Sequence, residues 1–153
     1  FLRARNFKVE EALAMLKSTI RWRQEFKADE IAAEELAEEG FEALAYEQGI
    51  DRHGHPVCYN LNPFQSKELS EDKAKLSRFL RWRVQLMEKS IASLDFSAGG
   101  INSIVQVIDL QNAPGFRRVS IQAIKKFLSL LHDNYPELAA KQVYLHIFIN
   151  PKP

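Results

Sequence analysis

The sequence predicts an α/β protein in which a helical N-terminal lobe precedes a mixed, largely parallel sheet containing a βαβ unit. Apolar residues recur at helical spacing over residues 9–26, and a strand, a helix and a strand follow one another over 101–149. We assign residues 1–42 to the helical lobe and 43–153 to a partial α/β lobe. The C-terminal part of that lobe is expected to be missing from this sequence.

The N-terminal lobe is expected to contain two helices. Over residues 9–26, one apolar stripe that includes Leu13 repeats every three or four positions, and a second stripe that includes Met15 runs beside it. Residues 29–39 indicate a second, acidic helix, because Gly40 follows as a helix terminator.

The α/β lobe is expected to begin with two short strands, at 43–50 and 57–61, joined by the turn residues 49–56. A long helix should follow these strands. Its N-terminus is marked by the capping hydroxyl of Ser70, and its apolar stripe continues to Leu94.

A strand, a helix and a strand are expected at 101–110, 119–132 and 142–149. The helix must end before Pro136, because the residue that precedes a proline resists the α conformation. This succession predicts parallel pairing with a right-handed crossover. Residues 121–131 are apolar on more than one side of the helix, so we expect either a missing part of the protein or a bound apolar molecule to cover them.

The net charge of +1 conceals an uneven distribution. Residues 1–27 carry seven basic and three acidic groups, residues 28–51 carry nine acidic groups and no basic one, and the remainder is mildly basic. Solvated helix faces would explain this pattern, and so would basic surfaces that approach anionic phosphate groups. The single cysteine, Cys58, excludes an internal disulfide, and no apolar run is long enough to predict a membrane span.

Motifs of catalysis and metal binding are mostly absent from the sequence. It contains no nucleophile elbow, Walker loop or dinucleotide-binding glycine pattern. His53, His55 and Cys58 lack a fourth ligand at suitable spacing, which favours a hairpin turn beside a core cysteine over a zinc site. Asp109 has no obvious partner for catalysis, and we expect it to cap the following loop. We therefore predict no catalytic residue and no metal.

Arg-Trp-Arg occurs twice, at 21–23 and 81–83, and could indicate base stacking with phosphate contacts. Both copies lie on predicted amphipathic helices. A packed Trp with arginines that extend to solvent is the more common arrangement there, so no nucleic-acid partner is predicted.

The chain resembles CRAL-TRIO domains, in particular those of the plant patellin branch. Motifs in the same order as in that family carry the resemblance: Phe1-Leu2-Arg3-Ala4-Arg5-Asn6-Phe7 with Trp22-Arg23, Asp51-Arg52-His53-Gly54-His55-Pro56-Val57-Cys58-Tyr59-Asn60, Phe79-Leu80-Arg81-Trp82-Arg83, Leu94-Asp95-Phe96-Ser97 with Gly99-Gly100, and Asp133-Asn134-Tyr135-Pro136-Glu137.

The resemblance implies a non-catalytic phospholipid-binding and transfer module, with phosphoinositide as the expected ligand and no cofactor besides bound lipid. The sheet would form the floor of an apolar pocket, and a gate helix and a GOLD domain would follow residue 153. The implied setting is the cytoplasm, with peripheral membrane contact, and the implied processes are membrane trafficking and cell-plate formation in dividing cells.

The lipid-binding residues implied by the resemblance are Arg5, Tyr59, Ile104, Gln106 and Ile108. Family members that hold phosphatidylcholine carry Ser and Thr at the positions of Ile104 and Gln106, so phosphoinositide is expected in preference to the choline lipid. Strand alternation should turn Ile104, Gln106 and Ile108 toward the cavity, and the intervening residues toward the covering helices.

Two departures from the family pattern accompany these expectations. Asn6 replaces a basic residue that many members carry, and about four residues are inserted within 142–149 relative to the family pattern, which leaves the register of that strand open. Two other functions also stay open. The chain could be a protein-interaction module whose apolar face meets a partner, or part of an α/β enzyme whose site lies beyond residue 153.

Overall fold

The computed structural model describes residues 1–36, 40–61, 69, 72–109, 111 and 121–146. Its elements, in order, are η1 (Arg3–Arg5), α1 (Val9–Phe26), η2 (Ile31–Ala33), β1 (Ala45–Ile50), β2 (Pro56–Leu61), α3 (Lys73–Ala92), β3 (Ile104–Asp109), α4 (Ile121–Asn134) and β4 (Ala139–Leu145). Helices and a sheet thus alternate as the α/β prediction requires.

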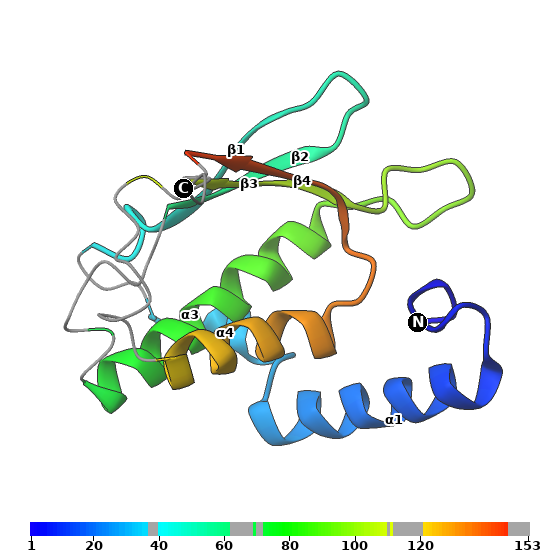
Figure 1. The fold of residues 1–153 in the computed structure, drawn as a ribbon, viewed down its shortest axis with the longest axis horizontal. Helices are drawn as coiled ribbons and strands as arrows, with labels where there is room; N and C mark the ends of the chain where they lie inside the picture. Colours follow the sequence, from blue (N-terminus) through cyan, green and yellow to red (C-terminus); the bar gives the residue numbers. More distant parts are fainter. Residues whose placement is uncertain (37–39, 62–68, 70–71, 110, 112–120, 147–153) are drawn as a thin grey trace, which may run out of the picture.

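The described strands form one four-stranded sheet in the order β1-β2-β3-β4. β1 and β2 pair as an antiparallel hairpin, whereas β2 pairs with β3, and β3 with β4, in parallel. The predicted βαβ unit is therefore confirmed as β3-α4-β4. Figure 1 shows α3 and α4 side by side below the sheet, with α1 farther from it.

Helix α1 has the bounds predicted from periodicity, and its apolar positions differ in burial. Ala12, Met15 and Thr19 are buried, while Leu13 and Ile20 are exposed. The buried side faces α4, where the Thr19 hydroxyl donates to the carbonyl oxygen of Asp133 at 3.4 Å. Tertiary contact with α4 therefore decides which stripe is covered.

The predicted acidic helix at 29–39 is wrong. The chain forms only the 3-10 turn η2 there, and Glu34 is already extended, at φ −82° and ψ 143°. Gln85 of α3 donates from Nε2 to the carbonyl oxygens of Ile31 and Glu34, at 2.7 Å each. These carbonyls bond to a side chain of another helix instead of continuing an α-helical ladder. Residues 37–39 lie outside the described part.

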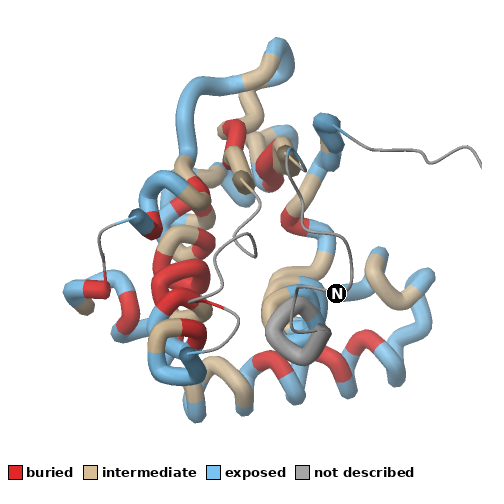
Figure 2. The backbone as a smooth tube through the Cα atoms, turned by 60° about the vertical axis from the view of Figure 1, so that its left-hand side comes forward, coloured by how far each residue is buried: buried red, intermediate tan, exposed pale blue. Residues whose placement is uncertain are grey.

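Helix α3 forms the centre of the core. Its N-cap is Asp72, whose carboxylate accepts from the backbone N–H groups of Ala74 and Lys75 at 2.8 and 3.0 Å; the predicted cap, Ser70, lies outside the described residues. Phe79 and Trp82 of α3 pack around Phe41 with ring centroids 5.4 Å from it. In Figure 2 the buried positions are densest along α3.

The expected strand boundaries shift most at the C-terminal end. β3 begins at Ile104, three residues later than predicted, and β4 spans Ala139–Leu145 instead of 142–149. Glu137 has a positive φ of 62°, and the N–H of Ile104 donates to the carbonyl oxygen of Leu138 at 2.9 Å. This contact starts the β3–β4 pairing directly after the turn. Residues 147–149 lie outside the described part.

Candidate binding site

One face of the sheet looks toward α3 and α4. The Ser90 hydroxyl of α3 donates to the Glu47 carboxylate of β1 at 2.5 Å, and Arg83 donates to Asn60 of β2 at 2.6 Å. Register then places Gln106 beside Cys58, and Ile108 beside Asn60, on this same face. We call it the helix-facing side of the sheet, and it is where the interior of the lobe lies.

The structure brings three of the predicted site residues together on the helix-facing side. Ile104 is fully buried and packs with Cys58, Met87 and Leu138, whereas Gln106 and Ile108, farther along β3, are half-buried. That alternation was predicted correctly. The predicted position of the covering helices is wrong, because α3 and α4 both lie on the side of Ile104 and not on the side of its neighbours in sequence.

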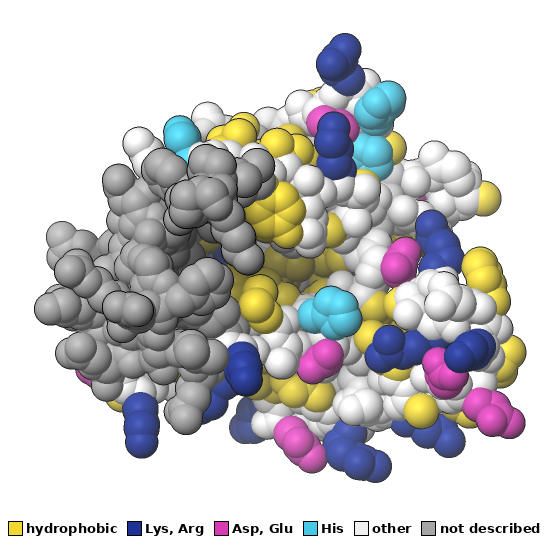
Figure 3. Space-filling model, in the orientation of Figure 1, with side chains coloured by type: hydrophobic (Ala, Val, Ile, Leu, Met, Phe, Trp, Pro, Cys, Tyr) yellow, Lys and Arg dark blue, Asp and Glu magenta, His cyan; other side chains and the backbone are white. Residues whose placement is uncertain are grey.

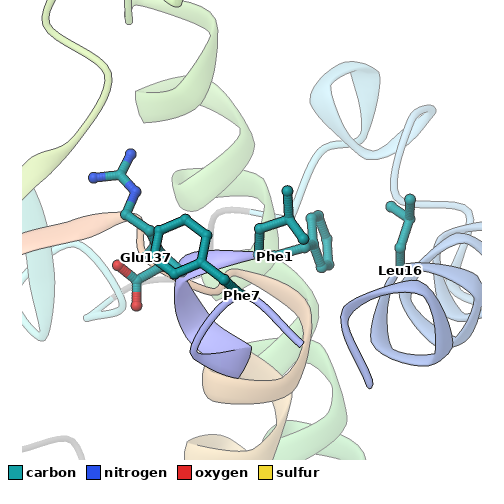
Figure 4. A pocket seen from close by; sticks show the side chains of 6 residues that line it. Phe1, Phe7, Leu16 and Glu137 are labelled. Carbon is teal, nitrogen blue, oxygen red and sulfur yellow. The ribbon is translucent and has the colours of Figure 1, made fainter. Parts of the chain in front are cut away.

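The other two predicted site residues lie elsewhere. Tyr59 is on the opposite side of the sheet, where its ring stacks on that of Tyr46 with centroids 5.1 Å apart. Arg5 is half-buried in η1, next to an open pocket of about 530 Å³. Figure 4 shows this pocket, which is lined by Phe1, Leu2, Arg3, Phe7, Leu16 and Glu137. Arg3, and not Arg5, belongs to its lining.

The space between the sheet and α4 is hollowed, and hydrophobic side chains line the hollow (Figure 3). On α4, Phe127, Leu130 and Leu131 are half-buried against the core, while Leu128 is 57% exposed. This pattern agrees with the prediction of a helix that is apolar on more than one side. Apolar walls with a few fixed polar groups are typical of a small-molecule site.

The most unusual polar group of this interior is Arg83 of α3, which is only 1% exposed. Its Nη2 donates to Asn60 Oδ1 at 2.6 Å, but among the described residues its Nε and Nη1 have no hydrogen-bond acceptor. The guanidinium carbon lies 5.6 Å from the ring centroid of Phe127 and 6.0 Å from that of Trp82. Burial lowers the pKa of Arg83.

Cys58 lies next to this guanidinium on β2 and is fully buried, as the prediction of a core cysteine required. Burial raises the pKa of the Cys58 thiol, and the nearby Arg83 charge offsets part of that rise. The thiol is therefore held in its neutral form, which is not nucleophilic. His53, in the neighbouring hairpin turn, is exposed; the described residues hold no cluster of three His, Cys, Asp or Glu side chains suited to a metal ion.

Sequence reasoning missed Arg83 because it treated all four Arg-Trp-Arg arginines as extending to solvent. In the structure Arg81 pairs with Glu34 and Arg23 pairs with Glu88, so only Arg21 fits that expectation. The helical spacing held a usable signal. Position 83 lies one turn after Phe79, on the buried side of α3.

Asp109 has a partner that the sequence did not indicate. It caps the following loop as predicted, accepting from the N–H of Gln111 at 2.8 Å, and its carboxylate also lies 2.7 Å from Nδ1 of His146. His146 directly follows β4, the strand beside β3, so parallel pairing brings the two side chains to the same edge. Position along the chain alone gave no sign of this pair.

Comparisons with known proteins agree with this geometry. A family model described as CRAL/TRIO domain matches residues 42–147. Patellin-3 of Arabidopsis thaliana is 47% identical across 96% of this chain and 31% of its own length. A phosphatidylinositol transfer protein SFH5 of Meyerozyma guilliermondii is 32% identical across 96% of this chain and 48% of its own length.

A solved structure titled "Crystal structure of Sfh5" superposes with a TM-score of 0.75 at 23% identity, covering 96% of this chain and 54% of that one. At that identity the likeness concerns the fold alone. The chain spans about a third of Patellin-3 and about half of the SFH5 protein.

Proposed function

The chain belongs to the CRAL/TRIO domain family, and from that premise we propose that it binds a phospholipid and transfers it between membranes without catalysing a reaction. The observation that carries the proposal is the hollow between the sheet and α4, with its apolar walls and its few polar groups on β2, β3 and α3. A diacyl lipid needs this combination, because its chains bury apolar area while its headgroup requires hydrogen bonds.

The lipid that we propose is a phosphoinositide in preference to phosphatidylcholine. Ile104 is sealed within the core and offers nothing polar, while Gln106 is half-buried and can donate to a phosphate oxygen. The name of the yeast relative, a phosphatidylinositol transfer protein, supports the same lipid class. Arg5 remains a proposed headgroup contact and Tyr59 a proposed lipid contact, both from the family resemblance, and neither lies on the helix-facing side of the sheet.

Contact with the membrane is proposed to be peripheral. Within the described ranges no helix is both long and apolar enough to cross a bilayer. Residues 1–27 are rich in basic side chains, and two of these, Lys17 and Arg21, are exposed on α1. The resemblance to patellins supports a cytoplasmic protein that acts in membrane trafficking and cell-plate formation, with a GOLD domain in the full-length protein.

A second candidate function is docking of a protein partner. It is favoured by four exposed apolar residues at helical spacing on α1: Val9, Leu13, Leu16 and Ile20. An exposed stripe of this kind is typical of interaction surfaces.

Native mass spectrometry of the full-length protein, followed by lipid extraction, separates the two functions. Phospholipid that co-purifies in stoichiometric amount, with inositol lipid enriched over choline lipid, would support lipid transfer. A lipid-free protein that carries a stoichiometric partner chain would support the docking function instead.

A further inference from the structure

We propose that Arg83 is an anion receptor inside the lobe, and that its Nε and Nη1 bind the phosphate of a phospholipid held between the sheet and α4. This inference rests on the proposed lipid-binding function and specifies where the headgroup phosphate is recognised. It concerns a residue that was not among the predicted site residues.

Arg83 has two buried nitrogen donors, Nε and Nη1, for which the described residues provide no hydrogen-bond acceptor. A guanidinium carries five N–H donors, and Arg83 uses Nη2 for its bond to Asn60. Nε and Nη1 are buried without an acceptor among the described residues. A buried charge is tolerated when it is paired and its hydrogen bonds are satisfied, so an occupant that accepts two N–H bonds fits this position.

The groups around Arg83 do not neutralise its charge. Cys58 is a buried, neutral thiol. Glu47, the carboxylate on the same side of β1, is exposed and accepts from Ser90. The cation therefore faces the interior without a described carboxylate partner.

Ring contacts do not remove this requirement. Phe127 and Trp82 lie 5.6 and 6.0 Å from the guanidinium carbon, close enough for cation–π attraction. Among the described residues, these contacts leave Nε and Nη1 without a hydrogen-bond acceptor. A phosphate can accept hydrogen bonds from both of these N–H groups.

The position of Arg83 suits a lipid headgroup. It projects from α3, its anchor Asn60 lies on β2, and Phe127 lies on α4, so three walls of the interior meet at the guanidinium. On the sheet, Asn60 of β2 pairs with Ile108 of β3, and Cys58 pairs with Gln106. Gln106 and Ile108 are half-buried, and both are proposed to contact the lipid. Asn60 also donates from Nδ2 to the carbonyl oxygen of Val107 at 3.3 Å, which fixes its amide and therefore the guanidinium.

The test compares Arg83→Met with the parent full-length protein. Each is loaded from vesicles that contain equal amounts of phosphatidylinositol, phosphatidylcholine and diacylglycerol, and bound lipid is quantified by mass spectrometry. The phosphate-free diacylglycerol reports on the apolar cavity alone. In Arg83→Met the ratio of phospholipid to diacylglycerol should fall about tenfold or more, as expected for loss of a charged hydrogen bond, while total bound lipid persists.

Matched variants separate phosphate recognition from folding. Arg81→Met removes the neighbouring arginine of the same helix, which pairs with Glu34, and should leave the lipid ratio unchanged. Arg83→Lys keeps the charge without the planar fork and should give an intermediate ratio. Without lipid, Arg83→Met should melt at or above the parent's temperature, because a buried charge without a full set of partners opposes folding.

A measurement on the unaltered protein covers the case in which Arg83→Met fails to fold. With 15N-labelled arginine, one buried Nε–H resonance should shift between protein loaded with phosphatidylinositol and protein loaded with diacylglycerol. Identical spectra would overturn the inference, as would a parent-like lipid ratio in Arg83→Met. A parent that binds no lipid would refute the proposed function itself. If inorganic phosphate alone stabilised the parent as much as phospholipid does, the site would bind free anions and the lipid assignment would fail.

Discussion

At the scale of single residues, Gly100 is fixed by space in the turn between α3 and β3. A Cβ at this position would lie 2.5 Å from both the carbonyl oxygen and the carboxyl carbon of Asp95. Asp95 is itself held by two bonds, its N–H to the carbonyl oxygen of Ile101 and its carboxylate to the N–H of Ser97. The turn therefore cannot shift without breaking contacts.

We expect Gly100→Ala to lower the free energy of unfolding by about 1–3 kcal/mol, the usual cost of overpacking. Urea denaturation followed by circular dichroism measures the change. Ala98→Ser, at an exposed position of the same turn, is the matched control and should leave stability unchanged. Equal midpoints for Gly100→Ala and the parent would show that the turn has more room than the structure indicates.

Asp109 links stability to pH. The backbone N–H of Gln111, and then the His146 side chain, hold the pKa of its carboxyl below the ordinary value of 3.8. A carboxyl whose pKa is lower in the folded state stabilises the fold above the unfolded pKa, and this contribution is lost as pH falls through the folded pKa. Unfolding free energies measured from pH 6 to 2 should therefore decline below about pH 4.

Asp109→Asn keeps an oxygen that can accept from Gln111 but cannot ionise, so its pH profile should be flatter in that range. Glu10→Gln, at an exposed position of α1, is the control, and its pH profile should follow that of the parent. Parallel profiles for Asp109→Asn and the parent would remove Asp109 from the explanation of acid sensitivity.

Sequence reasoning at this scale identified residues whose role follows from local chain chemistry, and missed those whose role comes from another element. The loop-capping role of Asp109 and the core position of Cys58 were predicted from neighbouring residues. The burial of Arg83 without acceptors for two of its nitrogen atoms among the described residues depends on elements that are distant in sequence. The pairing of Asp109 with His146 depends on such elements as well. Only the three-dimensional arrangement reveals such partners.

At the scale of elements, α1 is joined to α3 and to the end of α4 by a polar cluster. Arg23 of α1 donates through Nη1 and Nη2 to the two carboxylate oxygens of Glu88, at 2.8 and 3.1 Å. The Tyr135 hydroxyl donates to the same carboxylate at 2.6 Å. Glu88 raises the pKa of Arg23, so its guanidinium stays charged at neutral pH. Burial, followed by Glu88, raises the pKa of Tyr135, so its phenol stays protonated at neutral pH.

We predict a coupling energy of about 1 kcal/mol between Arg23 and Glu88, because the two side chains are 29% and 15% exposed and solvent screens part of the attraction. A double-mutant cycle with Arg23→Met, Glu88→Gln and both together measures this coupling. The pair of Lys8 and Glu11, which is well exposed, serves as the reference and should couple more weakly. Strictly additive effects at Arg23 and Glu88 would contradict this prediction.

Elements governed by local periodicity were predicted well, and elements shaped by contacts were not. The bounds of α1 followed from the spacing of apolar residues. The presence of a parallel βαβ unit followed from the order of the predicted elements. The acidic segment has a composition typical of helices. It nevertheless forms only the short turn η2, because Gln85 donates hydrogen bonds to the carbonyl oxygens of Ile31 and Glu34. β4 begins earlier than its apolar run because the Ile104–Leu138 bond sets its register.

At the scale of the whole molecule, the sequence predicted how β3 alternates but not which side the helices cover. The alternation is a local property of a strand. The covered side depends on how both crossovers, through α3 and α4, pass over the sheet, and they pass on the same side. That shared side creates the interior in which Arg83 and Gln106 lie.

The exposed side of α1 gives a prediction for membrane binding by the whole protein. Leu13 and Ile20 present apolar surface there, and the exposed cations Lys17 and Arg21 belong to the same helix. Each basic residue near an anionic surface contributes about 1 kcal/mol, and salt screens this attraction. The full-length protein should therefore sediment with vesicles that contain phosphatidylserine or phosphatidylinositol, and this binding should weaken as salt rises from 50 to 500 mM.

Charge reversal at both α1 cations, K17E with R21E, should abolish most of the anionic preference. K141E is the control, since Lys141 is also exposed but lies on β4, at the other end of the molecule from α1 in Figure 1. If α1 meets the membrane, the control should bind nearly as the parent does, because a charge more than a Debye length from the surface is screened. A loss in the control about half as large as in the double variant would mean that binding follows net charge. Equal binding of the parent to neutral vesicles at every salt concentration would exclude an electrostatic contribution by this helix.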